Sequence, residues 1–304
     1  MEPTPQSLHS SQIFTQTMRI LISNPTTFIA ISTILIYPVS SLHLSNPLID
    51  QSIVKTIAQS LLFIANSSGL QSIPFMNQSC HKLSEILISS VVNFPLYCTL
   101  LLVSKAAVVY SVNCTYSRKK FVSIKFFLLM KSIWRRIVST YFLICVLIVF
   151  CFTLFFILLL CFSKMLLAIG FSPDSIACVV VITVLLFLVL LAHVIIICDL
   201  CMVIAMWEDV SGFQALMRSS VLIRGQTRVG LMVFVGSTIG MGVVKGLFEH
   251  RVKVLSYGDA SLRIWERPVL VLVYSFVVLV DFMMSTVFFF SCKSYGLEAV
   301  ECGM

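Results

Sequence analysis

Charged residues are scarce in this chain. Of its 304 residues, 11% are charged and 59% are hydrophobic, and the mean hydropathy is +1.02. A soluble domain carries about 25% charged residues and could not cover so much apolar surface. The scarcity of charge and the long apolar runs therefore exclude a water-soluble globule and predict an all-α polytopic membrane protein.

Signatures of common catalytic sites are also missing. There is no HExxH or GxSxG motif, and the Gly240-x-Gly242 pair lies in an apolar run rather than in a nucleotide-binding loop. Cys198 and Cys201 have CxxC spacing without a second ligand pair, so core packing is the better interpretation. We therefore expect a protein that is not an enzyme and needs no metal or cofactor.

A signal peptide and a disulfide framework are not expected either. The first residues, MEPTPQSLHSSQ, are polar and contain no basic segment followed by an apolar one. The eleven cysteines are an odd number, and most lie inside apolar runs, where a thiol behaves as a small hydrophobe.

Six apolar runs are long enough to cross a bilayer, which takes about 20 residues of helix. They predict a single membrane domain over residues 1–304. The fourth run has about 30 residues, so its helix is expected to tilt or to project from the bilayer. The predicted spans are 26–44, 86–111, 137–162, 176–206, 229–247 and 268–291.

Basic residues are distributed unevenly between the two sides of these spans. Six spans place both termini on one side, whose segments hold 12 of the 21 Lys and Arg, and seven of these lie from Arg118 to Arg136. The positive-inside rule therefore predicts an integral membrane protein with cytosolic termini, in an endomembrane or the plasma membrane. The net charge of +8 indicates contact with anionic lipid rather than with nucleic acid.

Two glycosylation sequons support the same orientation. Asn66 and Asn77 begin Asn-x-Ser patterns in residues 45–85, the longest segment on the side opposite the termini. Asn113 begins a third sequon, which the predicted topology leaves in the cytosol. Glycosylation at Asn66 or Asn77 would agree with the predicted sidedness.

One short pattern occurs three times, each time before an odd-numbered span: a phenylalanine, three residues, a methionine and a basic residue. The copies are FTQTMR (14–19), FFLLMK (126–131) and FQALMR (213–218). Helical periodicity predicts an amphipathic interfacial helix at each copy, only partly so at the second. A break is predicted after each helix, at Asn24-Pro25, at Trp134-Arg135-Arg136 and at Gly225.

The three copies favour an internal repeat of one interfacial helix and two spans, with units of about 10–112, 113–206 and 207–295. Three unrelated helices of similar composition are the alternative. In both cases the nearby basic residues are predicted to contact anionic lipid of the cytosolic leaflet. They are Arg19, Arg118, Lys119, Lys120, Lys125, Lys131, Arg135, Arg136 and Arg218.

Several ionisable residues fall inside the predicted spans, where a central charge costs about 2.5–3.5 kcal/mol. At 1.5 Å per residue, Lys105 and Asp281 both lie about 18–20 Å from the cytosolic boundary, which predicts an ion pair between the second and sixth spans. That pair would be a packing device or a proton or substrate relay. The third interpretation is that Lys105 is unpaired and extends toward the interface.

The positions of the glycines in the fifth span and of one acidic pair predict two structural features. In the fifth span, Gly236 and Gly240, like Gly242 and Gly246, have the spacing that lets helices approach closely, and packing within the chain is preferred over dimerisation. The acidic pair at 208–209 follows the fourth span at a predicted helix start, where acids favour the helix dipole.

Four stretches resemble a plant family of six-span transmembrane proteins of unknown function, and the likeness covers nearly the whole chain. They are SKAAVVYSVNCTYSRKKFVS (104–123), WRRIVSTYF (134–142), WEDVSGFQALMRSSVLIRGQTRVG (207–230) and STVFFFSCKSY (285–295). The resemblance implies an acidic helix start at Glu208, whereas Lys105 and Asp281 depart from the small or polar residues expected there. The arrangement is also distantly similar to the non-catalytic membrane domain of some bacterial glycerophosphodiester phosphodiesterases, which implies no phosphodiesterase activity.

The sequence therefore favours a non-enzymatic membrane organiser or adaptor whose interfacial helices bind lipid, with other membrane proteins as further partners. The alternative is a transporter or lipid-handling protein with a polar path near Lys105, Asp199 and Asp281. A water-filled cavity that reaches the middle of the membrane would favour the alternative, and a centre filled with side chains would favour the organiser.

Overall fold

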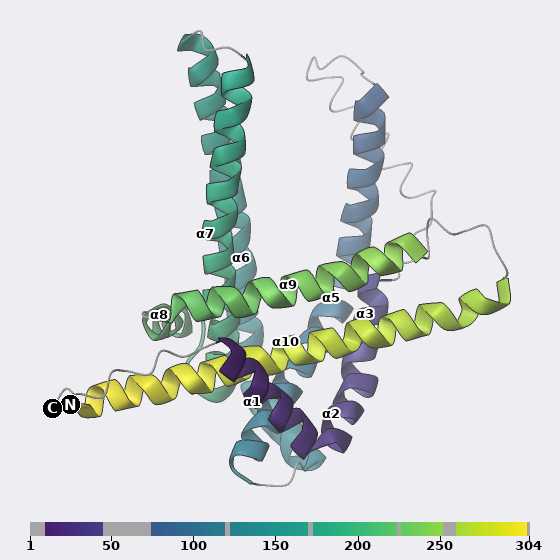
Figure 1. The fold of residues 1–304 in the computed structure, drawn as a ribbon, viewed down its shortest axis with the longest axis vertical. Helices are drawn as coiled ribbons and strands as arrows, with labels where there is room; N and C mark the ends of the chain where they lie inside the picture. The colour runs from purple at the N-terminus through teal and green to yellow at the C-terminus, as the bar shows by residue number, and fades with distance from the viewer. Residues whose placement is uncertain are drawn as a thin grey trace. The chain divides into compact units, whose positions relative to one another are not determined.

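A computed structural model of the 304-residue chain describes residues 10–44, 74–118, 122–169, 173–223, 226–251 and 260–302 (Figure 1). These residues are helical apart from short links, and no strand occurs among them. The helices are α1 (Ser10–Ser23), α2 (Pro25–Ile31), η1 (Ser32–Ile36), α3 (Tyr37–Leu44), α5 (Pro74–Tyr116), α6 (Ser123–Ile169), α7 (Pro173–Trp207), α8 (Phe213–Leu222), α9 (Thr227–Glu249) and α10 (Ala260–Cys302).

Among the described residues, six helical segments are long and apolar enough to cross a membrane, which confirms the number predicted from the sequence. The largest difference is at the third, which begins 14 residues before the predicted 137 because α6 is one uninterrupted helix from Ser123. The segments are Pro25–Leu44, Pro95–Tyr116, Ser123–Leu159, Val179–Trp207, Thr227–Glu249 and Trp265–Ser294.

The first of these segments changes helix type in its middle. The π-helix η1 joins α2 to α3, and the N–H of Tyr37 bonds to the carbonyl of Ser32, five residues earlier. Pro38 follows at once and has no N–H to donate, so a local change in hydrogen-bond register accommodates it without ending the helix. Pro38 thus lies beside a π-helical turn.

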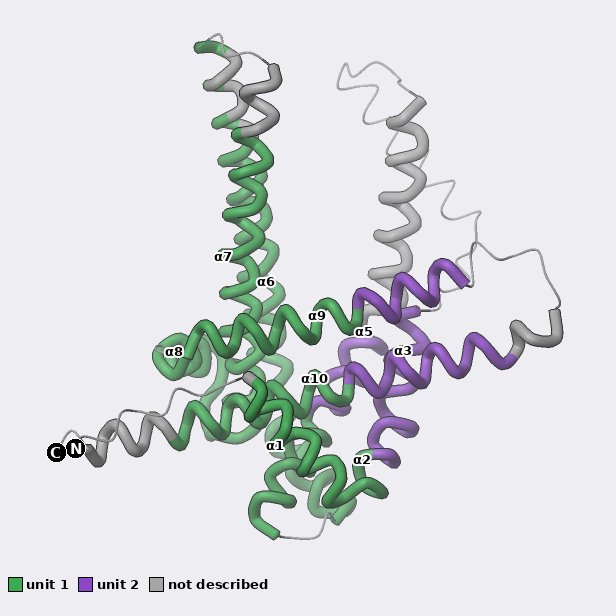
Figure 2. Tube along the Cα trace, viewed as in Figure 1, with its two compact units in different colours: residues 1–28, 106–241, 279–304 green, residues 29–105, 242–278 purple. Residues whose placement is uncertain are grey.

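The chain divides into two compact units, coloured green and purple in Figure 2. Unit 1 comprises Met1–Phe28, Ala106–Met241 and Leu279–Met304, and unit 2 comprises Ile29–Lys105 and Gly242–Val278. Both units combine segments that are distant in sequence. The division into three sequential repeats stays a prediction.

In unit 1, α6 and α7 lie side by side as a long antiparallel pair, and α8 packs against α7 (Figure 1). The last turns of α7, from Leu200 to Met206, are buried on every side. Farther along the pair the apolar side chains are exposed, such as Phe156 on α6 and Leu186 on α7. One end of the pair therefore belongs to the core, and the other has the apolar surface expected of helices in contact with acyl chains.

Unit 2 has a small core of its own in which an aromatic stack is prominent. The ring of His43 in α3 stacks on Tyr97 of α5 and on Tyr274 of α10, with centroids 6.0 and 5.7 Å away. Ile36 and Val39, which precede His43 by a few residues in the sequence, are buried. The described part of the unit thus joins α3, α5 and α10.

Candidate functional site

The boundaries of four candidate spans come together in unit 1. The ring of Phe290 near the end of the sixth span contacts Tyr116, the last residue of the second, and Trp207, the last residue of the fourth, at centroid distances of 5.3 and 5.7 Å. Asn24, directly before the first span, donates a hydrogen bond of 3.1 Å to Thr115. These segments are the ones that the predicted topology places on one side of the membrane.

The link between α7 and α8 is held in an uncommon backbone conformation. Gly212 has φ +59° and ψ −127°, a combination that residues with a side chain rarely adopt. Its N–H donates to the Oγ1 atom of Thr140 on α6 at 3.0 Å, and its carbonyl accepts the first bond of α8, from Leu216 at 3.1 Å. The glycine therefore lets the chain turn sharply against α6 and start α8.

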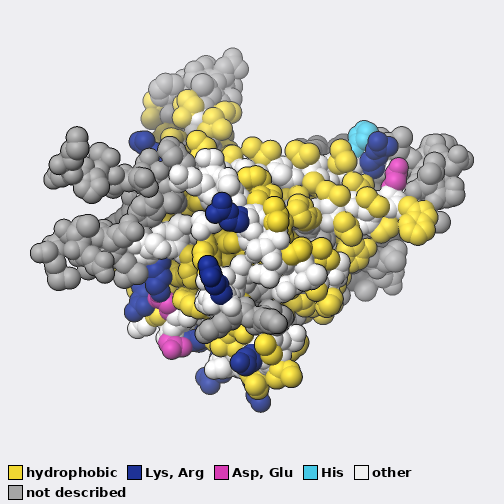
Figure 3. All heavy atoms as spheres, turned by 60° about the horizontal axis from the view of Figure 1, so that its bottom comes forward, with side chains coloured by type: hydrophobic (Ala, Val, Ile, Leu, Met, Phe, Trp, Pro, Cys, Tyr) yellow, Lys and Arg dark blue, Asp and Glu magenta, His cyan; other side chains and the backbone are white. Residues whose placement is uncertain are grey.

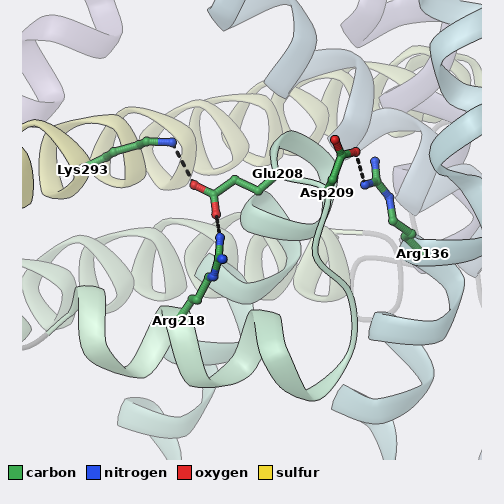
Figure 4. Close-up of polar contacts among 5 residues, drawn as sticks. All are labelled: Arg136, Glu208, Asp209, Arg218 and Lys293. Atoms are coloured by element: carbon green, nitrogen blue, oxygen red, sulfur yellow. Dashed lines mark hydrogen bonds and ion pairs between the residues drawn. The ribbon is translucent and has the colours of Figure 1, made fainter.

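This link carries a cluster of charged residues, the Glu208 cluster, made of Glu208, Asp209, Arg136, Arg218 and Lys293 (Figure 4). One carboxylate oxygen of Glu208 accepts from Arg218 Nη1 on α8 at 2.8 Å, and the other accepts from Lys293 Nζ on α10 at 2.8 Å. Lys293 also lies over the ring of Phe289, 5.9 Å from its centroid. A single carboxylate thus joins the end of α7 to both α8 and α10.

The charge of Glu208 is stabilised by its neighbours. Burial alone would raise the pKa of this carboxyl, but hydrogen bonds and positive charge from Lys293 and Arg218 outweigh burial and hold the pKa below its ordinary value of 4.5. Glu208 is therefore ionised near neutral pH, and the pairing is present under physiological conditions.

The second acid of the cluster pairs with α6. Asp209 is fully exposed and bonds Arg136 Nη1, while the Arg136 side chain is only 24% exposed. Arg136 Nε is buried and has no hydrogen-bond partner among the described residues. Arg136, predicted as a lipid contact, is thus largely occupied by a contact within the protein.

The cluster corrects the role predicted for the acidic pair. Glu208 and Asp209 precede α8 by several residues, and the first turn of that helix contains no acid. They form ion pairs with cations from α6, α8 and α10 instead of stabilising the dipole of α8 at its first turn. The sequence signal was their position, since no other acids lie among the basic residues of the segments 112–136 and 207–228.

A groove of about 700 Å³ lies elsewhere in unit 1, between α1 and the end of α5, and we name it the Arg19/Arg118 groove. Both arginines are exposed, and none of the described residues that line the groove is acidic. Gln16 Nε2 donates to the Tyr116 hydroxyl at 2.8 Å across it. The lining residues are Ser11, Gln12, Thr15, Gln16, Arg19, Ile20, Ser23, Thr115, Tyr116 and Arg118.

Arg118 has a backbone conformation that is rare for its residue type. Its φ is +50°, in the left-handed region, and its N–H donates to the carbonyl of Thr115 at 3.2 Å where α5 ends. Glycine usually occupies this position after a helix, because a Cβ costs about 1–2 kcal/mol there. The arginine therefore carries a conformational cost that a glycine would avoid.

The three copies of the repeated pattern lie in different surroundings. Phe126 and Met130 of the second copy are 5% and 7% exposed, whereas Phe213 and Met217 of the third are 65% and 54% exposed. Phe14 of the first is 49% exposed. The copies share a sequence pattern, yet the second packs inward and the other two do not.

The breaks predicted after these copies are confirmed in two cases and wrong in one. The chain bends at Asn24 between α1 and α2, and α8 ends before α9 begins, although Gly225 itself lies outside the described residues. No break follows Trp134, because α6 continues through both arginines that follow it. Ile133 and Ile137 are buried there, so packing extends along one helix face across the predicted break.

The other residues predicted to contact lipid are exposed, paired with an acid, or outside the described residues. Lys125, Lys131 and Arg135 are exposed on α6, and Arg218 pairs with Glu208 while its side chain stays 60% exposed. Lys119 and Lys120 lie outside the described residues, as does Asn66. Asn77 lies in the first turn of α5, where its side chain is not described. Both glycosylation sites stay predictions.

The residues predicted to carry charge within spans fall in both units. Lys105 is 7% exposed and belongs to unit 2, while Asp281 belongs to unit 1 and accepts a hydrogen bond from Ser237 of α9. Asp199 and His193 are half-buried on α7. The pair of Lys105 and Asp281 stays a prediction, and Ser237 is a partner of Asp281 that the sequence did not indicate.

The packing within the chain predicted for the glycine pattern of α9 stays a prediction, because the described residues place no atom against three of the four glycines. A Cβ added at Gly236, Gly242 or Gly246 would meet no described atom within 4 Å, and Gly240 is half-buried. The close approach occurs instead at Gly230, where an added Cβ would lie 3.1 Å from the ring of Phe288 and 3.3 Å from Ile196. Helix spacing alone could not indicate which small residues face a neighbour.

The comparisons place the chain in a family. A model described as a domain of unknown function (DUF8558) matches residues 3–303, so the chain belongs to that family over nearly its whole length. No curated protein and no solved structure matches the chain. Membership therefore gives no catalytic or binding residues to transfer, and the argument for function depends on the site described above.

Proposed function

We propose that this protein is a non-enzymatic membrane organiser or adaptor that binds anionic lipid at the end of unit 1 where the candidate spans meet. The observation that carries the proposal is an excess of exposed cations. Among the side chains that the structure describes at this end, the acids are Glu208 and Asp209, and both are already paired. The exposed cations of its described segments are Arg19, Arg118, Lys125, Lys131, Arg135, Arg218 and Arg228, of which Arg218 pairs with Glu208.

Such an excess of positive charge suits a membrane surface. Each Lys or Arg near an anionic leaflet contributes about 1 kcal/mol of attraction, and the effect falls off within a Debye length. Figure 3 shows a face on which Lys and Arg lie among hydrophobic side chains, with few Asp or Glu. In this proposal the basic end faces the cytosolic leaflet, which carries the anionic lipids, and both termini are cytosolic.

The short helix α8 supports an interfacial placement. Phe213, Met217 and Val221 are exposed along one side, while Ala215 and Ser219 on another side are fully buried against the unit. A helix that shows apolar side chains beside a basic residue, here Arg218, can rest on the boundary between acyl chains and headgroups. We extend this to α1, where Phe14 and Arg19 are both exposed, and regard the two helices as members of an internal repeat.

A transporter or lipid-handling protein is the second candidate. Its support is the hydrogen bond inside candidate spans between Ser237 on α9 and Asp281 on α10. A carboxylate within a span costs free energy of insertion, and such residues are commonly functional. Asp281→Asn would leave lipid binding at the basic end intact and abolish transport of a substrate. Retention of flux across vesicles by this variant would exclude the relay.

Lipid selection by the purified protein tests the main proposal. The full chain is extracted into nanodiscs that contain equal amounts of phosphatidylcholine and phosphatidylglycerol, and the lipids that remain bound after transfer to detergent are counted by native mass spectrometry. We expect enrichment of phosphatidylglycerol that Lys125→Gln/Lys131→Gln reduces several-fold.

A matched pair of cations provides the control. Arg251 follows α9 and Arg267 lies near the start of α10, both are exposed, and both belong to the segment predicted on the opposite side of the membrane. Arg251→Gln/Arg267→Gln removes the same charge and should leave the enrichment unchanged. An equal loss in both double variants would show that only net charge matters, and no enrichment in the wild type would refute the proposal.

A further inference from the structure

We propose that the Arg19/Arg118 groove binds the phosphate of one anionic phospholipid, with Arg19, Arg118 and the Tyr116 hydroxyl as its donors. This inference rests on the proposed function and names the site and ligand class for it. The ligand is a phospholipid with net negative charge rather than any anion of the cytosol.

The groove lies at the level where headgroups are expected. Its α1 wall ends one residue before Asn24, and the first candidate span begins at Pro25. Its other wall includes Thr115 and Tyr116, the last residues of the second candidate span. The 3.1 Å hydrogen bond from Asn24 to Thr115 holds these boundaries together, so the groove opens where two spans leave the hydrocarbon.

No described acid compensates the charges of the groove. Among the described residues, no carboxylate lies within ion-pair distance of Arg19 or Arg118, and no acid lines the groove. By contrast, Arg136, Arg218 and Lys293 all have carboxylate partners in the same unit. Two arginines that line one groove and have no described counter-charge can bind a phosphate, since the planar guanidinium of arginine donates paired hydrogen bonds to phosphate oxygens.

The hydrogen bonds already made show which other group can donate. The hydroxyls of Thr15, Ser23 and Thr115 donate to backbone carbonyls of their own helices, so their hydrogens are occupied. The Tyr116 oxygen instead accepts from Gln16 at 2.8 Å, which leaves its own hydrogen available. Gln16 thereby positions a neutral donor in the lining that also contains the two arginines.

The backbone of Arg118 agrees with a role for its side chain. A left-handed φ of +50° at a residue other than glycine is sustained at a cost, and such outliers cluster at ligand-binding sites. Nothing in the helix end requires arginine, because glycine satisfies the same hydrogen bond with less strain. A guanidinium that faces a bound phosphate accounts for an arginine at this position.

The size of the groove favours a lipid over a free ion. Its volume is about 700 Å³, in the range of about 300–1,000 Å³ typical of sites for organic ligands and far above what phosphate alone needs. Ile20 adds an apolar side chain to a lining that is otherwise polar. A headgroup with its glycerol would occupy this space, while the acyl chains continue along the spans.

Two substitutions separate binding from folding. Arg118→Gly removes the cation and relieves the left-handed strain, and Arg19→Gln keeps a good helix former on the exposed face of α1. The full chain in uncharged detergent is titrated with dioctanoyl phosphatidylglycerol, and native mass spectrometry gives the Kd of the first bound lipid. We expect each substitution to weaken binding roughly fivefold and the pair roughly 25-fold, which corresponds to about 1 kcal/mol per arginine.

The controls separate this site from the wider basic surface and from a free anion. Arg251→Gln/Arg267→Gln and dioctanoyl phosphatidylcholine give the baselines for charge and for zwitterionic lipid. An unchanged first Kd in Arg19→Gln/Arg118→Gly, with enrichment of phosphatidylglycerol retained, would overturn the groove and leave the proposed function standing. Absence of any preference in the wild type would overturn both.

Displacement of the lipid by inorganic phosphate at similar concentrations would overturn the lipid assignment, and persistence of the lipid would support it.

Discussion

The Glu208 cluster and the Arg19/Arg118 groove use the same kind of residue in opposite ways. In the cluster, Arg218 and Lys293 share one carboxylate at 2.8 Å each, and the three residues join α7, α8 and α10. In the groove, two exposed arginines have no described acid beside them. Cations of the cluster are thus satisfied by the fold, and cations of the groove are available to a ligand.

The two regions also differ in the type of residue that has a positive φ. The cluster places Gly212 at φ +59°, and the groove places Arg118 at φ +50°. A glycine at such a position favours folding, whereas an arginine there indicates that the side chain is needed. The contrast suggests that the cluster mainly maintains the structure and that the groove mainly binds, and four substitutions or conditions can test this division.

The largest expected effect is on the cluster. Glu208→Gln leaves Lys293 and Arg218 without their carboxylate, so the free energy of unfolding should fall by about 2 kcal/mol. Thermal or denaturant unfolding in detergent measures the change. Asp209→Asn is the matched control, because the fully exposed Asp209 should contribute less than about 0.5 kcal/mol. Equal losses in both variants would contradict a special role for Glu208.

The next largest effect is expected at the turn before α8. Gly212→Ala introduces a Cβ at φ +59°, and although no atom lies within 4 Å of it, the strained backbone should cost about 1.5 kcal/mol. Gly236→Ala is the control, since it also has open space but lies inside helix α9. Alanine there should be neutral or stabilising by up to about 1 kcal/mol. The same unfolding assay compares the two.

Acid should weaken the cluster and spare the groove. Because the pKa of Glu208 is lower in the folded state than its ordinary 4.5, the stabilisation is complete above that value and is lost as pH falls through the lower folded value. The stability difference between the wild type and Glu208→Gln should therefore shrink in that acidic range. Arginines stay protonated throughout, so lipid binding in the groove should not follow the same titration. Stability measured against pH for both proteins checks the first point, and lipid binding against pH checks the second.

The smallest expected effect on stability is a gain in the groove. Arg118→Gly removes left-handed strain of about 1–2 kcal/mol and adds the larger unfolded-state entropy of glycine, so the net gain should be about 0.5 kcal/mol. A loss of stability would mean that the Arg118 side chain supports the fold, and the division between the two regions would fail.

The sequence predicted the features that depend on local pattern. Apolar length gave the number of candidate spans, and the Asn24-Pro25 pair marked the bend between α1 and α2. The predicted break after Trp134 was wrong, because α6 continues through the two arginines there. Basic residues do not end a helix when the residues that follow them are buried by packing, as Ile137 is. Local pattern therefore indicates helices better than it indicates where they end.

Features that depend on contacts between distant segments were not predictable in the same way. Glu208 and Lys293 are 85 residues apart, and Gly212 meets Thr140 across 72 residues, so no spacing rule relates them. Gly230 approaches Phe288, while a Cβ added at the conspicuous glycines 236, 242 and 246 would meet no described atom within 4 Å. The basic residues were recognised, but only the structure distinguished those with acidic partners from those without.

Lipid-dependent thermal stability tests the central claim most directly. A ligand that binds only the folded state raises Tm, and the rise grows with the ratio of ligand concentration to Kd. The account predicts that phosphatidylglycerol added to the detergent-solubilised protein raises the Tm of the wild type and of Glu208→Gln by a similar amount, but raises that of Arg19→Gln/Arg118→Gly little more than phosphatidylcholine does. An equal rise in Arg19→Gln/Arg118→Gly would contradict the assignment of lipid binding to the groove.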